Sequence, residues 1–319
     1  MKASLAAFGF CLVLGVVLYP ALIGVLAREH AGQRIQSYGP ATHRIKAGTP
    51  TMGGILFCAL AVLAWLLFDH SRAGFVLAFA LVGGAALGVL DDLANIRGLG
   101  VLGLLGRHKL VVQGLVGLLV GIGLYKIGAT RQVLPVLGSV DLHGGVIVLA
   151  VLAVVATSNA VNLTDGVDGL AGWCSVLVFS ALWALALHLG AHGAAVVSAA
   201  VAGGVVAFLV YNWWPARVFM GDTGSLALGC ALAAVAGEVR MLWLLPLLGL
   251  VFVAEALSVI VNVTAITRFG KRVFLASPLH HHFEELGLRE QGLVLWFGAA
   301  AGVAAALAVL AALRSGVGS

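Results

Sequence analysis

Long apolar stretches alternate with short polar segments along the whole chain. They occupy residues 3–27, 51–68, 74–90, 110–125, 144–161, 170–187, 194–211, 225–237, 241–265 and 292–313. Most of them approach the ~20 residues that an α-helix needs to cross a bilayer. The pattern therefore predicts an all-α polytopic membrane protein with about ten transmembrane helices, in which residues 1–319 form a single integral-membrane domain. Between Lys126 and Leu142, Gly, Pro and β-branched residues predict an outer loop with two short strands.

The overall composition agrees with a membrane protein. Hydrophobic residues make up 61% of the chain, charged residues only 10%, and the mean hydropathy is +1.10, far from the averages of soluble domains. The formal net charge of +5 would attract anionic lipid headgroups or a soluble phosphorylated substrate. Nucleic acid is a poor candidate partner, because no basic domain stands outside the predicted helices.

The basic residues predict the orientation in the membrane. If the amino terminus is outside, the inner segments carry twelve of the eighteen Lys and Arg residues. Basic residues stay preferentially on the cytoplasmic side during insertion, so this orientation is favoured. With an even number of spans, both termini are then outside.

Acidic residues gather on the same predicted face. Five of the seven aspartates lie where apolar stretches end, on the cytoplasmic side of this topology: Asp91, Asp92, Asp165, Asp168 and Asp222. Ionised carboxylates near hydrocarbon cost a few kcal/mol each, so they normally face water, a cation or a partner. We therefore expect an active-site cleft on the cytoplasmic face.

The first polar segment of interest contains Lys46 and the stretch Thr49-Pro50-Thr51-Met52-Gly53-Gly54. Pro50 suits the start of a helix, and Thr49 and Thr51 can cap its free amides. Basic side chains beside a helix amino terminus favour an anion. A basic loop that simply follows the topology rule accounts for the segment equally well.

The second segment holds the adjacent pair Asp91 and Asp92, with Lys109 following at the start of the next span. Neighbouring helical residues point roughly 100° apart, so one aspartate can face a cavity while the other meets a basic group or a second ligand. The alternative is a simple charge pair at a helix end. It is disfavoured, because acids at a helix carboxyl terminus oppose the macrodipole.

The third segment spaces polar residues by three, at Asn159, Asn162, Asp165 and Asp168. In a regular helix this spacing drifts by roughly 60° per step, so the four share a face only if the backbone unwinds. Gly166 and Gly169 would allow a broken helix that lines a cavity. A turn between two helices is the less favoured alternative.

The fourth segment, residues 212–225, places Asp222 in a glycine-bounded turn, and Phe219 could supply a flat surface for a nucleobase. The fifth is His280-His281-His282-Phe283-Glu284. Three consecutive imidazoles on regular backbone do not all reach one metal, which favours phosphate binding or proton handling over zinc. Glu255, within an apolar stretch, either lines the cavity or is a paired structural acid.

These motifs, in this order, resemble those of the phospho-N-acetylmuramoyl-pentapeptide transferases, a branch of the polyprenyl-phosphate N-acetylhexosamine-1-phosphate transferase superfamily. The resemblance spans residues 43 to 285. It implies Mg²⁺-dependent transfer of phospho-N-acetylmuramoyl-pentapeptide from UDP to undecaprenyl phosphate, which releases UMP and makes the first lipid-linked peptidoglycan precursor. It further implies a bacterial plasma (inner) membrane location, an active site that faces the cytoplasm, and a homodimer.

The resemblance also implies roles for individual residues. Asp222 is similar to the principal metal ligand, supported by Asp92 and Asp165, while Asp91 or Asp92 would engage or deprotonate the lipid phosphate. Lys46 and Lys109 would stabilise developing charge. Residues that resemble the uridine pocket are Lys46, Gly166, Asp168, Asn212 and Phe219. Residues that resemble those around the phosphates and the sugar are Asn159, Asn162, His280, His281 and His282, with His281 also a catalytic candidate.

One position departs from the family pattern, and three alternatives stay open. The branch usually has Lys three residues after the second aspartate, where this chain has Asn95; Arg97 or Lys109 could substitute for that cation. We expect a direct displacement, with a covalent intermediate on Asp222 as the alternative. The competing functions are N-acetylglucosamine-1-phosphate transfer, which the triple histidine disfavours, and secondary transport.

Overall fold

Each predicted apolar stretch forms a helix in the computed structural model, which describes residues 1–29, 48–97, 106–134 and 138–315. The long helices are α1 (Lys2–Arg28), α2 (Gly54–Phe68), α3 (Arg72–Ile96), α4 (Gly106–Lys126), α5 (Gly145–Thr164), α6 (Leu170–Leu189), α7 (His192–Asn212), α8 (Gly221–Glu238), α10 (Leu250–Phe269) and α12 (Glu290–Arg314). The short ones are α9 (Leu245–Leu248) and α11 (Leu279–Glu285). The predicted stretch 241–265 is thus divided, because the helical path changes at Gly249 between α9 and α10.

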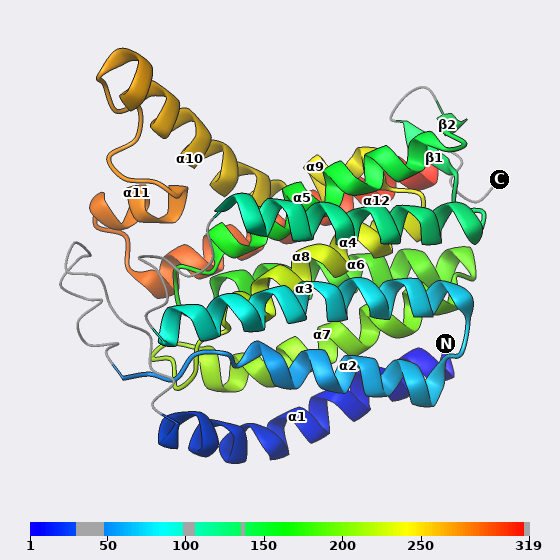
Figure 1. Ribbon diagram of the computed structural model, residues 1–319, viewed down its shortest axis with the longest axis horizontal. Helices are drawn as coiled ribbons and strands as arrows, with labels where there is room; N and C mark the ends of the chain where they lie inside the picture. Colours follow the sequence, from blue (N-terminus) through cyan, green and yellow to red (C-terminus); the bar gives the residue numbers. More distant parts are fainter. Residues whose placement is uncertain (30–47, 98–105, 135–137, 316–319) are drawn as a thin grey trace.

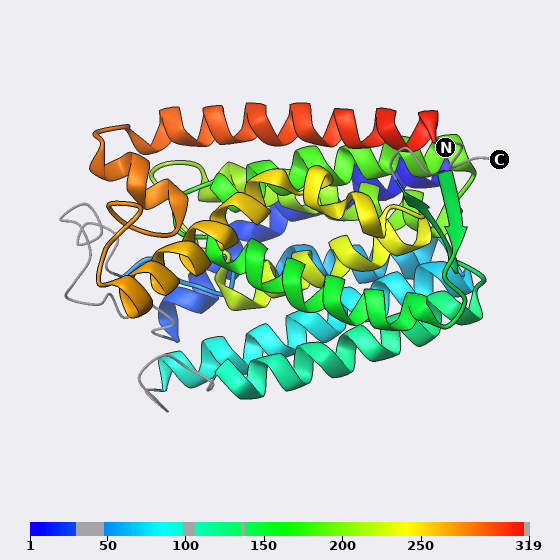
Figure 2. The ribbon, with the colours of Figure 1, turned by 90° about the horizontal axis from the view of Figure 1, so that it is seen from above.

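The helices run side by side in one bundle, except that α10 leans away from it; the chain then turns back, and α11 lies between α10 and the bundle (Figures 1 and 2). Within the described residues, eight helices are long and apolar enough to cross a membrane: α1, α3, α4, α5, α6, α7, α10 and α12. The prediction of an all-α polytopic membrane protein is therefore confirmed. Length and composition support fewer spans than the ten expected, because α2 has only 15 residues and α8 carries Asp222 and Glu238.

Helix α8 lies in the centre of the bundle, so it does not need an apolar surface that faces lipid. It packs against α3, α5 and α2, and nearly all of its residues are buried. Glycines on α3 make this packing close: a Cβ at Gly84 would meet the backbone of Ala227, and one at Gly88 would collide with the backbone of Asp222. Small residues at the interface let two helix backbones approach in this way.

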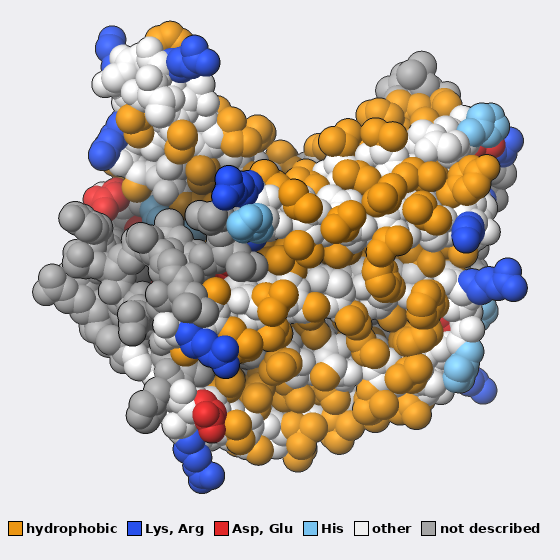
Figure 3. Space-filling view, viewed as in Figure 1, with side chains coloured by type: hydrophobic (Ala, Val, Ile, Leu, Met, Phe, Trp, Pro, Cys, Tyr) orange, Lys and Arg blue, Asp and Glu red, His pale blue; other side chains and the backbone are white. Residues whose placement is uncertain are grey.

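The outside of the bundle is apolar. Large hydrophobic side chains are exposed along the helices, among them Val13, Leu119, Val148 and Ile260, and Figure 3 shows hydrophobic side chains over most of the bundle face, with Lys and Arg near its two ends. An apolar belt between two charged ends is the surface that a bilayer requires. Both termini lie at the same end of the bundle (Figures 1 and 2), which we call the terminal end.

A β-hairpin covers part of the terminal end, as the sequence predicted. Strands β1 (Arg131–Leu134) and β2 (Gly138–Asp141) pair antiparallel, with Arg131 opposite Asp141. Buried Gln132 fixes the hairpin to the bundle: its Nε2 donates to Gly237 O at 3.0 Å, and its Oε1 accepts from Leu242 N–H at 3.1 Å.

Two local predictions were wrong. The segment around Asp165 is a turn between two helices, since α5 ends at Thr164 and α6 begins at Leu170 after Gly169 at φ 82°. It is not a helix broken at membrane depth. The start of α2 has Gly53 as its N-cap, with no capping hydrogen bond from a side chain. Thr49 and Thr51 therefore do not cap it; its first amides bond instead to the carbonyls of Phe219 and Met220.

Candidate active site

Three helix ends meet at the end of the bundle opposite the termini, which we call the acidic end. The last turns of α3 and α5 arrive there, and α8 begins there (Figure 1). They bring together Asp91 and Asp92 from α3, Asn162 from α5 and Asp222 from α8. Residues 60 or more positions apart in the chain are thus in direct contact.

Lys109, in the first turn of α4, links two of these aspartates. Its Nζ lies 2.8 Å from Asp91 Oδ2 and 2.7 Å from Asp222 Oδ2. The other oxygen of Asp222, Oδ1, accepts a hydrogen bond from Asn162 Nδ2 at 2.9 Å. One ammonium therefore offsets part of the charge of the buried Asp91 and the half-buried Asp222, and both oxygens of Asp222 are held in place.

Asp92 has different hydrogen-bond partners from the adjacent Asp91. Its Oδ1 accepts from the N–H of Asp222 at 3.1 Å, and its Oδ2 accepts from the N–H and the hydroxyl of Thr223 at 2.9 and 2.6 Å. These amides belong to the first turn of α8, where N–H groups have no partner within the helix. Asp92 is therefore an N-terminal cap for α8 that is supplied by α3, and its negative charge also suits that end of the helix dipole.

Asp165 follows the last residue of α5 and is half-buried. Among the described residues its carboxylate accepts no hydrogen bond. Burial raises the pKa of Asp165 well above its usual value, and the negative charges of Asp222, Asp92 and Asp168 raise it further. Within the described residues, the ionised form of Asp165 therefore has no compensating positive charge.

The donor set at the acidic end suits a hard divalent cation that keeps ligands from elsewhere. Within the described ranges, no three His, Cys, Asp or Glu side chains converge closely enough to hold a metal by themselves. Mg²⁺ does not require such a cage, since it is usually bound by one or two carboxylates together with waters and substrate phosphates. Asp222 and Asp165, which are both partly exposed, can supply those carboxylates, whereas Asp92 is 5% exposed and its two oxygens bond to the start of α8.

The segment between α7 and α8 is tied to its neighbours by backbone groups. Asn212 accepts from Gly169 N–H and donates to Val218 O, both at 2.9 Å, while Asp168 Oδ2 accepts from Ala216 N–H at 3.0 Å. The backbone of Phe219 bonds to Pro50 and Gly53. Asn212 and Asp168, both predicted to bind substrate, thus join the α5–α6 turn to the segment that carries Phe219.

The three consecutive histidines have three different partners. His280 is fully buried and its Nδ1 lies 3.2 Å from Glu255 Oε2 on α10. His281 Nδ1 lies 2.6 Å from Glu284 Oε2 on the same helix. His282 Nδ1 accepts from Leu275 N–H at 3.2 Å. The three rings thus make these contacts with three different groups, and phosphate binding or proton handling by them stays a prediction.

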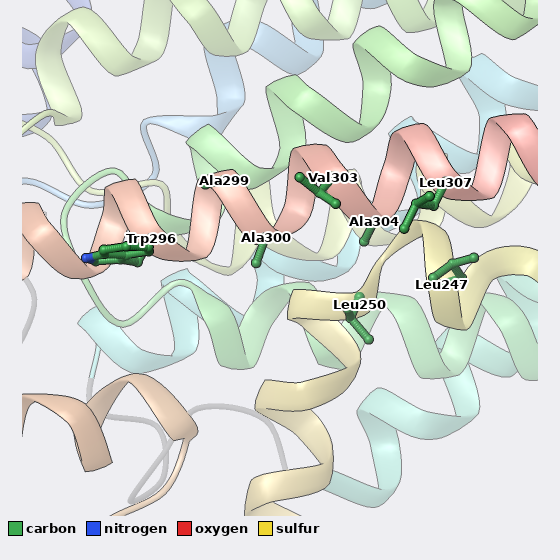
Figure 4. Close-up of a pocket in the computed structure, with 8 residues that line it drawn as sticks. All are labelled: Leu247, Leu250, Trp296, Ala299, Ala300, Val303, Ala304 and Leu307. Atoms are coloured by element: carbon green, nitrogen blue, oxygen red, sulfur yellow. The ribbon is translucent and has the colours of Figure 1, made fainter.

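A cavity of about 440 Å³ lies away from the acidic end, between α9, α10 and α12. Its lining is apolar and includes Leu247, Leu250, Trp296 and Val303 (Figure 4). With no charged or polar partner for a phosphate or a metal, it is not a site for phosphoryl chemistry.

Comparisons with known proteins agree with this arrangement. A family profile described as "Glycosyl transferase family 4" matches residues 72–239, which include Asp91, Asp165 and Asp222. A motif described as "Phospho-N-acetylmuramoyl-pentapeptide-transferase signature 1" matches residues 46–58. The proteins named phospho-N-acetylmuramoyl-pentapeptide-transferase in Moorella thermoacetica, Geobacillus kaustophilus and Thermoanaerobacter sp. (strain X514) are similar to the chain over most of its length. The Moorella protein is 45% identical over 294 residues, which are 91% of this chain and 92% of that protein. The Geobacillus protein is 42% identical over 306 residues, which are 93% of this chain and 94% of that protein. The Thermoanaerobacter protein is 42% identical over 289 residues, which are 89% of this chain and 91% of that protein.

The chain belongs to the phospho-N-acetylmuramoyl-pentapeptide transferase family.

The signature of this transferase family begins at Lys46, which lies outside the described residues. The described part of the signature packs against α8: a Cβ at Gly53 would lie 2.8 Å from Phe219 O, and one at Gly54 would collide with the backbone of Gly224. The two glycines therefore let the start of α2 touch the start of α8, next to Asp222. Any larger residue would push these two helix starts apart.

The position where the family usually has Lys holds exposed Asn95. The cation that contacts both Asp91 and Asp222 is Lys109, one of the two substitutes that the sequence suggested. Arg97 is exposed, and no contact between it and these aspartates is seen in the described part of the chain.

Sequence reasoning missed several residues of the transferase site. Buried Gln113 on α4 accepts from Asn159 Nδ2 at 2.8 Å, one turn below Lys109. Thr223 and Ser225 on α8 bond to Asp92 and Asn162. Gln113 could have been found as a polar residue within an apolar span, four positions after Lys109. The hydroxyls carry no such signal, because Thr and Ser are common in membrane helices.

Proposed function

We propose that this protein transfers phospho-N-acetylmuramoyl-pentapeptide from UDP to undecaprenyl phosphate in the presence of Mg²⁺, with release of UMP. Membership of the transferase family supports the reaction. The observation in the structure that carries the proposal is the convergence of Asp91, Asp222 and Lys109, together with Asn162, at one end of a membrane bundle. A soluble diphosphate donor and a lipid phosphate acceptor can meet only at such a boundary.

The acidic end faces the cytoplasm in this proposal, and the termini face outward. The support is the excess of Lys and Arg on the segments at that end. We place the protein in the bacterial inner membrane as a single integral-membrane transferase domain, because the donor is a cytoplasmic nucleotide and the acceptor is a membrane lipid. A homodimer is part of the same proposal and rests only on the resemblance to the family.

Asp222 and Asp165 are the proposed metal ligands. A bound Mg²⁺ would neutralise the diphosphate and the departing UMP. Lys109 holds Asp222 in position and adds a positive charge beside the transferred phosphate. The unpartnered, half-buried carboxylate of Asp165 supports this assignment, since a cation there would offset the cost of its ionised form.

Asp91 is the proposed contact for the lipid phosphate, and Asp92 fixes the start of α8. The sequence left the choice between the two aspartates open. Both oxygens of Asp92 accept hydrogen bonds from Asp222 and Thr223. Asp91 instead contacts Lys109, which also holds Asp222. In this division, Asp91 orients the attacking lipid phosphate and Asp92 keeps Asp222 in register.

Donor binding is proposed for the side of the site formed by the α5–α6 turn and the segment before α8. Phe219 and Asn212 would bind uridine together with Gly166, Asp168 and Lys46, and the histidines would border the phosphates and sugar. Asn159 and Asn162 extend the polar lining along α5. The reaction is a direct displacement in this proposal, in which Asp222 stays bound to Lys109 and Asn162 and holds the metal instead of attacking the donor.

The test is UMP release by purified protein supplied with undecaprenyl phosphate, Mg²⁺ and UDP-N-acetylmuramoyl-pentapeptide. We expect UMP release that EDTA abolishes and added Mg²⁺ restores. Asp222→Asn should abolish it while the protein stays folded. The matched control is Asp141→Asn in the hairpin at the terminal end, which should leave turnover unchanged. Release from UDP-N-acetylglucosamine alone would reassign the donor, and substrate flux in vesicles without UMP release would favour transport. A trapped phospho-sugar adduct on Asp222 would overturn direct displacement.

A further inference from the structure

Two buried polar side chains lie on one face of α10, the helix that leans away from the bundle (Figure 1). Glu255 is fully buried and Asn262 is 4% exposed. They are seven residues apart, which is about two helical turns, so both point the same way. Both point at the segment that follows α10 and leads into α11, where the three histidines lie. A buried carboxylate in a membrane helix marks a functional contact by default.

Asn262 anchors the segment before α11. Its Oδ1 accepts from the N–H groups of Val273 and Phe274 at 3.1 and 3.2 Å, and its Nδ2 donates to Ser277 Oγ at 3.3 Å. These bonds hold α11 against α10 without any contribution from Glu255. A conservative change at Glu255 should therefore leave α11 docked.

Glu255 contacts the first histidine twice. Its Oε2 accepts from the backbone N–H of His280 at 3.3 Å and lies 3.2 Å from the ring Nδ1. Neither Oε1 of Glu255 nor either ring nitrogen of His280 has a hydrogen-bond partner among the described residues, so Nδ1 lies beside Oε2 at ion-pair distance without an aligned hydrogen bond. A carboxylate oxygen 3.2 Å from Nδ1 would repel a lone pair on that nitrogen, so its position favours the tautomer of His280 that carries a proton on Nδ1.

The opposite edge of the His280 ring faces the donor side of the site. A Cβ at Gly166 would collide with His280 Nε2 and lie 2.8 Å from its Cε1. The ring therefore rests directly on the α5–α6 turn, between Asp165 and Asp168. The contact chain runs from α10 through Glu255 and His280 to Gly166, and it connects a helix outside the bundle to the turn that carries a proposed metal ligand.

We propose that Glu255 is a positioning residue that fixes the orientation and the tautomer of His280, so that the unprotonated Nε2 edge supports the α5–α6 turn on the donor side of the site. This inference rests on the proposed transferase function for its kinetic consequence. The orientation of His280 itself does not depend on that function. A carboxylate that orients an imidazole by accepting its Nδ1–H is a general device in enzyme sites.

The kinetic test compares Glu255→Gln, which keeps the shape of the side chain, with Glu238→Gln, which changes a half-buried acid at the terminal end. We expect Glu255→Gln to lower kcat/KM for the UDP-linked donor by at least about tenfold, in the range found for residues that orient a working side chain. KM for undecaprenyl phosphate and the melting temperature should match those of Glu238→Gln. Equal losses toward both substrates, or a large fall in melting temperature specific to Glu255→Gln, would show a merely structural role.

A double-mutant cycle tests whether Glu255 acts through His280. His280→Asn keeps a donor close to Glu255 but removes the ring edge that rests on Gly166. We expect His280→Asn to lose donor turnover, and Glu255→Gln to cost less than about twofold more in that background, because coupled residues are not additive. Independent, multiplying losses would overturn the proposal.

Nuclear magnetic resonance of protein labelled with ¹⁵N-histidine makes the test independent of turnover. The His280 signals are assigned by their absence in His280→Asn. We expect an Nδ1-protonated, Nε2-unprotonated imidazole in the wild type, and its loss in Glu255→Gln. An Nε2-protonated ring in the wild type would refute the inference even in a fully active transferase. Absence of transferase activity with the expected tautomer would instead refute the proposed function alone.

Discussion

Replacing Asp92 with Asn distinguishes the role of Asp92 from that of its neighbour Asp91. The sequence alone left the roles of the two residues open. In the structure Asp92 is 5% exposed and accepts three hydrogen bonds from the first turn of α8. An asparagine in the same place keeps one acceptor oxygen and presents an NH₂ group in place of the other. That NH₂ would face a backbone N–H of α8, so two donors would meet and one amide would lose its partner.

The expected cost follows from the bonds that are lost. A buried N–H left without an acceptor costs about 1–3 kcal/mol. Loss of a negative charge next to a helix amino terminus costs up to about 2 kcal/mol in a partly buried site. Together they predict that Asp92→Asn lowers the free energy of unfolding by about 3 kcal/mol. For Asp91→Asn we expect about 1 kcal/mol or less, because Lys109 keeps its contact with Asp222 at 2.7 Å.

The assay is equilibrium unfolding of both variants in mixed detergent micelles, with turnover measured on the same preparations. Asp91→Asn should lose turnover while its stability stays near that of the wild type, and Asp92→Asn should lose both. Thr223→Val serves as a control, since it removes only the hydroxyl donor at 2.6 Å; it should lower stability by about 1 kcal/mol and leave turnover within a few-fold. If Asp92→Asn were as stable as the wild type but inactive, Asp92 would act in the chemistry and the capping argument would fail.

Two further predictions concern the surroundings of the site. Gly88→Ala should displace Asp222 and abolish turnover, because the added Cβ collides with the backbone of Asp222. Gly114→Ala on α4, where nothing lies within 4 Å of the added Cβ, is the control and should behave as the wild type. Equal activity of the two variants would contradict the close α3–α8 packing. Asn95→Lys restores the residue usual in the family at an exposed position and should leave turnover unchanged or raise it, as measured by UMP release, whereas complete loss would indicate a rearranged site.

Much of the architecture could be predicted from local sequence. Each apolar stretch became a helix, since a long run of hydrophobic residues has one stable conformation in a bilayer. The hairpin after Lys126 also followed from local rules. The errors were local too. Gly166 and Gly169 were read as an unwound helix, although glycines of this kind also end one helix and begin the next.

The sequence by itself determined that this is a polytopic membrane protein with acidic groups at the ends of its spans, because hydropathy and charge are properties of each segment taken alone. Only the tertiary structure decided what each acidic group does. Asp91 and Asp92 are neighbours, yet one contacts Lys109 and the other caps α8 by bonding to Asp222, which lies 130 residues later in the chain. Glu255 on α10 contacts His280 on α11. Such partners depend on how helices distant in the chain pack together, and the close contact of α3 with α8 through Gly84 and Gly88 sets that packing.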